Sequence, residues 1–243
     1  MIHTTKGIVL RTIKYGETSV IASIFTELFG IQSYMMNGVR TQNKNSKAPF
    51  FQVSSILDMQ VYHSDLKNLQ RIKELKWNYL YKNILNNIPK NGVALYMIEL
   101  LHKCLKQPEA NPDLFNFCED AFMELDTCSD EVCANFPIYF SIHLADFFGF
   151  RLLDNYSASN NNFNVKEGNF ICAGELPLNQ TNADVSKHIS QILKARLPGD
   201  LEEIKLNKHI RRKILAIMEN YYVHHIPEFG AMKTLPVLYQ LLS

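Results

Sequence analysis

The sequence predicts an α+β protein in which a small five-stranded β-barrel precedes an all-helical domain. Three observations lead to this fold class. The first 80 residues hold short β-branched runs separated by turn residues. From about residue 79 the apolar period changes from two to three and four, which is typical of helices. Residues 154–169 are rich in Asn and Ser and predict a small loop-rich insertion. Five short strands with a long third-to-fourth connection favour an OB-fold barrel.

The barrel strands follow one another along the first third of the chain. The first run ends at Tyr15-Gly16, the second at Gly30, and the third at Asn37-Gly38, a strong turn dipeptide. A polar basic loop closed by Pro49 then precedes the fourth run. The fifth run has apolar residues at helix-like spacing, and we assign it as a strand. The predicted strands are residues 6–13, 19–25, 31–36, 51–62 and 69–77.

Helical periodicity dominates the rest of the chain. An opening Asn111-Pro112-Asp113 favours a helix start, and Gly149 is placed as a C-cap after the most apolar helix. The predicted helices are residues 92–105, 112–126, 134–148, 183–196 and 207–225, with one more short helical turn in the last 15 residues. We expect four parts: a barrel (1–80), a helical domain (81–153), a loop-rich region (154–182) and C-terminal helices packing on the helical domain (183–243).

The charge of the chain is unevenly distributed. Its 243 residues carry 25 basic and 24 acidic side chains, a net charge of +1. Residues 1–80 hold 10 basic and 5 acidic residues, whereas residues 81–150 hold 4 and 10. Because residues 1–80 are basic and residues 81–150 are acidic, we expect phosphate contacts only in the barrel and in a basic cluster at residues 205–213.

These basic residues suggest nucleic-acid contacts, because cations follow phosphates while aromatic rings stack on bases. The candidate rings are Tyr15, Tyr34, Phe50 and Tyr62. Alternatively, the rings belong to the core and the cations are merely solvated. The predicted DNA-binding residues are Arg11, Lys14, Arg40, Lys44, Lys47, Arg71 and Lys73. A possible second basic site, or else a solvated helix end, comprises Lys205, Lys208, Arg211, Arg212 and Lys213.

Motifs for catalysis or metal binding are missing from the sequence. It has no GxSxG, Walker A, GxGxxG or HExxH pattern. Cys128 and Cys133 have a spacing near that of half a zinc site, but no matching pair follows, so we interpret them as ordinary thiols. We therefore predict no enzyme, no metal and no cofactor, although a catalytic set assembled only in three dimensions stays open.

The start of the chain lacks the pattern of a secretory signal, and no apolar stretch is long enough to span a membrane. The five cysteines are expected to be reduced thiols in a cytoplasmic protein that does not contact membranes.

The opening residues contain Gly7-Ile8-Val9-Leu10, Tyr15-Gly16-Glu17, Phe25-Thr26 with Gly30, then Gly38 and Arg40. A looser pattern continues through Glu99-Leu100-Leu101, the apolar helix ending at Gly149, and the closing segment with Arg212, His225 and Lys233-Thr234-Leu235. On these residues the chain resembles the RecO family of bacterial DNA-repair proteins. The resemblance implies an OB-fold followed by a helical bundle. It also implies a nucleoid-associated protein that binds single- and double-stranded DNA and anneals complementary strands.

The resemblance implies particular partners as well. It points to RecR, with which the protein would load RecA onto DNA coated by single-stranded DNA-binding protein (SSB), and to the acidic C-terminal tail of SSB. Lys103, Lys106 and the 205–213 cluster are candidates for the cationic rim of a tail pocket. Two alternatives remain: a scaffold whose barrel binds protein, and a metal-dependent nuclease or transferase.

The sequence departs from the family in one respect. Many members carry a four-cysteine zinc module, and here Asn and Ser occupy its expected position near residues 154–159, leaving Cys172 alone. One thiolate cannot hold structural zinc. We expect this region to be stabilised by side-chain turns and by packing of Phe163 and Phe170.

Overall fold

A computed structural model describes residues 1–39, 47–172 and 183–242. The chain forms two compact units: Met1–Lys82 with Leu105–Met123, and Asn83–Cys104 with Glu124–Ser243. The four-part division expected from the sequence stays a prediction. Among the described residues, no helix combines the length and apolar character that crossing a lipid bilayer requires.

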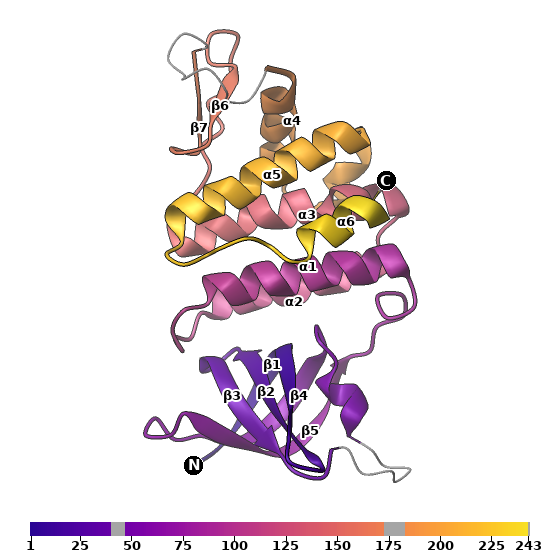
Figure 1. The fold of residues 1–243 in the computed structure, drawn as a ribbon, viewed down its shortest axis with the longest axis vertical. Coiled ribbons are helices and arrows are strands. Elements are labelled where there is room, and N and C mark those ends of the chain that lie inside the picture. The colour runs from indigo at the N-terminus through magenta and orange to yellow at the C-terminus, as the bar shows by residue number, and fades with distance from the viewer. Residues whose placement is uncertain (40–46, 173–182, 243) are drawn as a thin grey trace. The chain divides into compact units, whose positions relative to one another are not determined.

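The first unit contains a closed barrel of five strands (Figure 1). Around the barrel the order is β1-β2-β3-β5-β4, and the β3–β5 pair alone runs parallel. This closed topology confirms the predicted OB-type barrel. The strands are β1 (Ile2–Tyr15), β2 (Ser19–Thr26), β3 (Gly30–Met36), β4 (Ile56–Tyr62) and β5 (Leu69–Tyr79).

The fourth strand begins later than the sequence pattern predicts. Residues 48–51 instead form a short 3-10 helix, η1 (Ala48–Phe51), with Pro49 in its first turn. Proline fits a helix start because its fixed φ is helical and its missing N–H would find no partner there. Ser54 then adopts a left-handed φ of 74°, and this turn leads the chain into β4.

A bulge in β5 explains the helix-like spacing of its apolar residues. Ile72 pairs with Val61 and Glu74 pairs with Gln60, so Lys73 is the additional residue on β5. A bulge shifts the alternation of side chains by one position. Ile72 and Leu75, three residues apart, therefore both pack on the barrel core.

The N-terminal part of α2 (Pro112–Thr127) packs on the barrel within the first unit. The Phe115 ring contacts the Phe25 ring at 5.6 Å between centroids, and Lys6 Nζ lies 2.7 Å from Glu119 Oε2. Gly30, with a φ of 60°, lies so close to the backbone of Glu109 that a Cβ would collide with it. These contacts join residues 105–123 to the barrel.

The second unit is helical and is built around α3 (Asp130–Leu144), most of whose side chains are buried. Helices α1, α4 and α5 pack against α3, and α6 packs on α1 (Figure 1). Gly149 has a φ of 82°, which confirms it as the left-handed C-cap. The other elements are α1 (Ile88–Cys104), η2 (Ala145–Phe148), α4 (Ala183–Lys194), η4 (Pro198–Glu203), α5 (Lys208–His225) and α6 (Leu235–Leu241).

The loop-rich region contains a short hairpin, β6 (Asn162–Asn164) and β7 (Asn169–Ile171), which the sequence pattern did not predict. Strands of three residues are too short to show an alternation. The expected packing is confirmed, because Phe163 and Phe170 are buried and their rings meet at 5.3 Å. The Asn155 side chain also donates to the Phe170 carbonyl and accepts from its N–H.

Candidate nucleic-acid interface

Strand register gathers residues that are far apart in the sequence on the outer side of the barrel. We call two adjacent cross-strand rows the outer face. In the first row Ile13 of β1 pairs with Ile21, Ile21 with Met35, Met35 with Arg71, and Arg71 with Tyr62. The second row contains Arg11, Ser23, Ser33 and Leu69. The outer face thus combines apolar side chains, hydroxyl groups and two arginines.

Both arginines on the outer face are exposed, and so are two tyrosines near them. Tyr15 at the end of β1 is 52% exposed, and Tyr62 at the end of β4 is 47% exposed. Within the described part of the chain, no carboxylate lies within ion-pair distance of Arg11 or Arg71. The outer face therefore offers two arginines that form no ion pair with a described carboxylate, beside accessible rings.

The other candidate rings lie elsewhere. Tyr34 points into the barrel core and is fully buried, and burial raises the pKa of its phenol. Phe50 is half-buried and stacks on Trp77 with 4.6 Å between ring centroids. Tyr34 is thus a core residue, as the alternative interpretation of the rings expected, whereas Tyr15 and Tyr62 are available for contacts.

Lys14 and Lys47 lie at one end of the barrel rather than on the outer face. Lys14 pairs with the core residue Val20, so its side chain leaves β1 on the opposite side from Arg11. Thr12 Oγ1 donates to the Phe51 carbonyl at 2.9 Å, which brings η1 and the preceding Lys47 beside this part of β1. Both lysines are exposed. Arg40 and Lys44 lie outside the residues that the structure describes.

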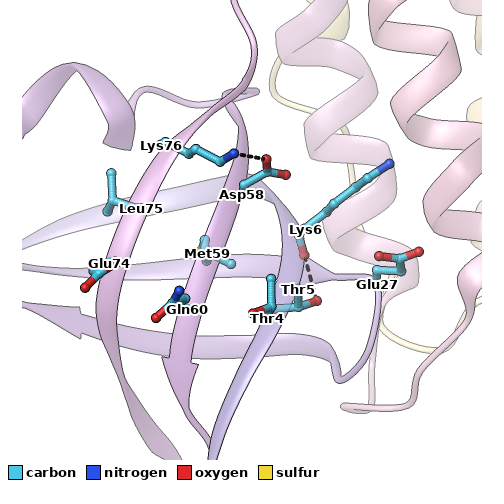
Figure 2. Close-up of a pocket in the computed structure, with 10 residues that line it drawn as sticks. All are labelled: Thr4, Thr5, Lys6, Glu27, Asp58, Met59, Gln60, Glu74, Leu75 and Lys76. Atoms are coloured by element: carbon cyan, nitrogen blue, oxygen red, sulfur yellow. Dashed lines mark hydrogen bonds and ion pairs between the residues drawn. The ribbon is translucent and has the colours of Figure 1, made fainter.

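A cleft of about 500 Å³ on strands β1, β4 and β5 has a different character (Figure 2). Figure 2 shows Lys76 pointing to Asp58, with 3.3 Å between Nζ and Oδ2, while Lys6 extends away from them. Lys6 pairs with Glu119, and this hydrogen bond raises the pKa of the Lys6 ammonium. Because Glu27 and Glu74 also line it, the cleft is unfavourable for phosphate.

The predicted residue Lys73 is partnered by groups near this cleft. Its Nζ donates to Gln60 Oε1 at 3.2 Å and lies 3.9 Å from Glu74 Oε1. Arg71 pairs with the uncharged residues Met35 and Tyr62, whereas Lys73 lies beside the Glu74 carboxylate, so the two predicted β5 cations differ in their electrostatic surroundings.

A second cleft, of about 620 Å³, adjoins the outer face at Ser23 and Ser33. The β4–β5 loop and residues 105–110 form its other sides. His63 stacks on Phe29 with 3.8 Å between centroids, and its Nε2 lies 3.1 Å from Asp65 Oδ1. Lys67 and the predicted rim residue Lys106 are exposed at this cleft, which extends the outer face with further cations and an aromatic wall.

The 205–213 cluster divides into two groups in the helical unit. Its two arginines are half-buried. Arg211 donates to the carbonyl of Leu206, before α5, at 2.7 Å and to that of Leu242, the C-cap of α6, at 3.3 Å. Arg212 donates to the Tyr239 carbonyl within α6. The Arg212 guanidinium also lies 5.4 Å from the centre of the Tyr239 ring. The exposed cations of the cluster are Lys205, Lys208 and Lys213.

Lys103, the other predicted rim residue, is also engaged within the helical unit. Its Nζ donates to the Phe229 carbonyl and lies 5.0 Å from the centre of the Phe229 ring.

In the described part of the chain, no group of three or more His, Cys, Asp or Glu side chains is arranged to hold a metal ion.

The sequence offered Arg11, Arg71, Tyr15 and Tyr62 as candidates but not the residues that connect them on the outer face. Ser23, Ser33 and Met35 belong to strands whose alternate positions are buried. The alternation of apolar and polar residues in these strands is a sequence signal that could have shown which side chains point outward. The pairing of β3 with β5, which brings Arg71 beside Met35, had no local signal.

The fold defines a class: an OB-type barrel protein with a second, helical unit. Two family models cover nearly the whole chain, "Recombination protein O N terminal" at residues 1–81 and "Recombination protein O C terminal" at residues 85–234. The chain belongs to the RecO family, as its resemblance predicted, and membership supports a role in DNA repair.

Relatives over the full length agree with this assignment. The chain is 29% identical to the DNA repair protein RecO of Bacteroides fragilis, with 100% of both chains covered. It is 28% identical to the DNA repair protein RecO of Flavobacterium johnsoniae, with 98% of each chain covered. The same name belongs to a relative in Porphyromonas gingivalis, which is 26% identical with full coverage of both chains.

Proposed function

We propose that this protein is a non-catalytic recombination mediator whose outer barrel face binds DNA. The observation that carries the proposal is the placement of Arg11 and Arg71, which form no ion pair in the described chain, beside apolar side chains and exposed tyrosines. Arginines neutralise phosphates, and rings stack on bases irrespective of sequence. Lys14 and Lys47, with Arg40 and Lys44, would extend the phosphate contacts.

Family membership supports the mediator role. The protein would bind single- and double-stranded DNA, anneal complementary strands, and act with RecR to load RecA onto SSB-coated DNA. The SSB tail would contact it through a pocket with a cationic rim. Annealing of complementary strands coated with the cognate SSB, with and without RecR, tests this role. Failure to accelerate annealing in either condition contradicts it.

DNA contact by the outer face is tested with matched charge reversals. Arg71→Glu and Lys76→Glu lie on the same strand and change the net charge equally, but Lys76 is paired with Asp58. Binding of a labelled oligonucleotide is measured by fluorescence anisotropy across a salt series. We expect R71E to weaken binding and to flatten the salt dependence by about 0.7 in log–log slope for each lost single-strand phosphate contact. K76E should retain both values.

The apolar row from Ile13 to Met35 also suits a protein partner, which favours a scaffold as the second candidate. A scaffold whose barrel binds protein predicts no salt-dependent oligonucleotide binding near physiological salt. If R71E and K76E bind DNA as tightly as the unaltered chain, the outer face is not the DNA-binding surface.

A further inference from the structure

Asn37 and Gly38 form a bend that directly follows β3, at the border of the outer face. Val20, which separates Ser19 from Ile21 on β2, packs in the barrel core, so the Ser19 side chain leaves the strand on the outer side. Ser19 Oγ donates to Asn37 Oδ1 at 3.1 Å, which holds the Asn37 side chain on that side as well. Asn37 therefore lies beside the outer face.

The backbone of this bend leaves the Asn37 amide open to attack from its own chain. Gly38 has a left-handed φ of 69°, and a Cβ built on it would meet nothing within 4 Å. Because glycine has no side chain, none shields its nitrogen from the side-chain carbon of the preceding asparagine. Asn37 is also exposed, so that water and hydroxide reach the amide. The bend thus provides both the room and the solvent that cyclisation of an asparagine requires.

The hydrogen bond from Ser19 adds an electronic effect. Its hydroxyl lies at the amide oxygen of Asn37, where negative charge develops when a nucleophile adds to the amide carbon. A donor placed at such an oxygen stabilises the tetrahedral intermediate of the addition. Ser19 therefore favours nucleophilic addition to the Asn37 amide.

The chain contains a second Asn-Gly pair in a contrasting environment. Asn91 and Gly92 lie inside α1, and the Asn91 N–H donates to the Asn87 carbonyl at 2.9 Å. Gly92 is buried, and a Cβ there would collide with the Leu241 side chain. Helical hydrogen bonds and close packing oppose the backbone rotation that cyclisation needs. The two pairs share one chemistry under opposite constraints.

We propose that Asn37 is a deamidation site that adds a negative charge at the border of the outer face. The Gly38 nitrogen loses its proton to solvent base and attacks the Asn37 side-chain carbon. A C–N bond forms in a cyclic succinimide, and the C–N bond to the amide nitrogen breaks, so that ammonia leaves with a proton taken from solvent. Water then opens the ring at either carbonyl carbon. The products are aspartate or isoaspartate, with one water consumed and one ammonium ion released.

The consequence of the new charge rests on the proposed DNA-binding function. A carboxylate at position 37 lies on the side of the barrel that carries Arg11 and Arg71. One added negative charge at about 4 Å from a phosphate in water lowers affinity roughly fivefold. Deamidation therefore weakens DNA binding as converted chains accumulate.

Peptide mapping of the full chain during incubation in mildly alkaline buffer tests the modification. We expect Asn37 to convert to aspartate and isoaspartate, whereas Asn91 in the same sample remains an amide. In urea, where the fold no longer constrains either pair, both should convert at similar rates. If Asn37 converts no faster than Asn91 in the folded chain, the proposal is wrong.

Two variants on β2 test the part played by the hydrogen bond. Ser19→Ala removes the donor to Asn37 Oδ1 and should slow conversion at position 37, whereas Ser23→Ala on the same strand should leave the rate unchanged. Circular dichroism verifies that both variants are folded. An equal or faster conversion in S19A would overturn the role assigned to Ser19.

The effect on DNA is measured separately. Asn37→Asp carries the new charge from the start, and Asn37→Gln is its uncharged control. In fluorescence anisotropy at low salt, we expect N37D to bind a labelled oligonucleotide roughly fivefold more weakly than N37Q. If Arg71→Glu weakens binding and N37D does not, the charge effect is wrong. If neither weakens it, the outer face is not the DNA-binding surface, and the peptide map still decides whether Asn37 is modified.

Discussion

Removing the exposed rings of the outer face tests whether bases, as well as phosphates, contact the barrel. Tyr15 and Tyr62 are each about half exposed, so Tyr15→Ala and Tyr62→Ala remove little buried apolar area. Each substitution should lower the free energy of unfolding by about 1 kcal/mol. A base stacked on an aromatic ring contributes about 1–3 kcal/mol. Each substitution should therefore weaken single-strand affinity about 5- to 150-fold if its ring holds one base.

The salt dependence distinguishes this loss from an electrostatic one. Tyrosine carries no charge near neutral pH, so its removal releases no additional counterions and should leave the salt slope unchanged. Anisotropy titrations at four or more salt concentrations, with Arg71→Glu measured alongside, provide the comparison. Tyr15→Phe and Tyr62→Phe keep the ring and should bind normally, as should Leu66→Ala at a 96% exposed position.

Two results would refute base stacking on these rings. Affinity that stays within about twofold for both alanine variants means that neither ring holds a base. A flattened salt slope in Tyr15→Ala or Tyr62→Ala means that the rings position cations rather than bases.

Three further predictions concern stability. Lys90→Met removes charged hydrogen bonds to two carbonyls and should cost about 2–4 kcal/mol in urea unfolding, whereas Lys187→Met on the exposed side of α4 should be near neutral. Glu228→Gly relieves a left-handed φ of 55° and should gain about 0.5 kcal/mol, a gain that Glu228→Ala should not show. The N–H groups of Leu197 and Arg196 hold the pKa of Asp200 below its ordinary value. The ionised carboxylate therefore stabilises the fold, in full at any pH above that ordinary pKa. Asp200→Asn should therefore lower the melting temperature near pH 7, and the difference should vanish as pH falls through the lowered pKa; a constant difference would contradict this.

Local sequence patterns were sufficient for most of the fold. The runs that became β1, β2 and β3 alternate and end at turn glycines, and the helical runs keep their period over three or more turns. The differences arise where one residue changes the geometry. Pro49 initiates a 3-10 turn that delays β4, and the bulge at Lys73 gives a strand the apolar spacing of a helix.

The candidate site was less accessible to sequence reasoning because it depends on strand register. Arg11 and Arg71 are 60 positions apart, and three strand pairings, including the parallel β3–β5 pair, place them in adjacent rows of the outer face. A list of basic residues could not separate Arg71, beside Met35 and Tyr62, from Lys73, which faces Glu74. Cross-strand neighbours determine whether a cation is available to a phosphate.

The basic run KLNKHIRRK shows the same limit on a helix. Its five cations look equivalent in sequence, yet the arginines lie where α5 faces the carbonyl end of α6 and the lysines lie in solvent. The planar guanidinium can donate to several carbonyls at once, and cations are favoured at a helix C-terminus. Arginine at these two positions therefore fits a structural role, and reversal of Arg211 or Arg212 would disturb the attachment of α6 together with any surface charge. A test of this region for DNA or SSB contact should therefore alter Lys205, Lys208 and Lys213, because their reversal changes the surface charge without removing a bond to α6.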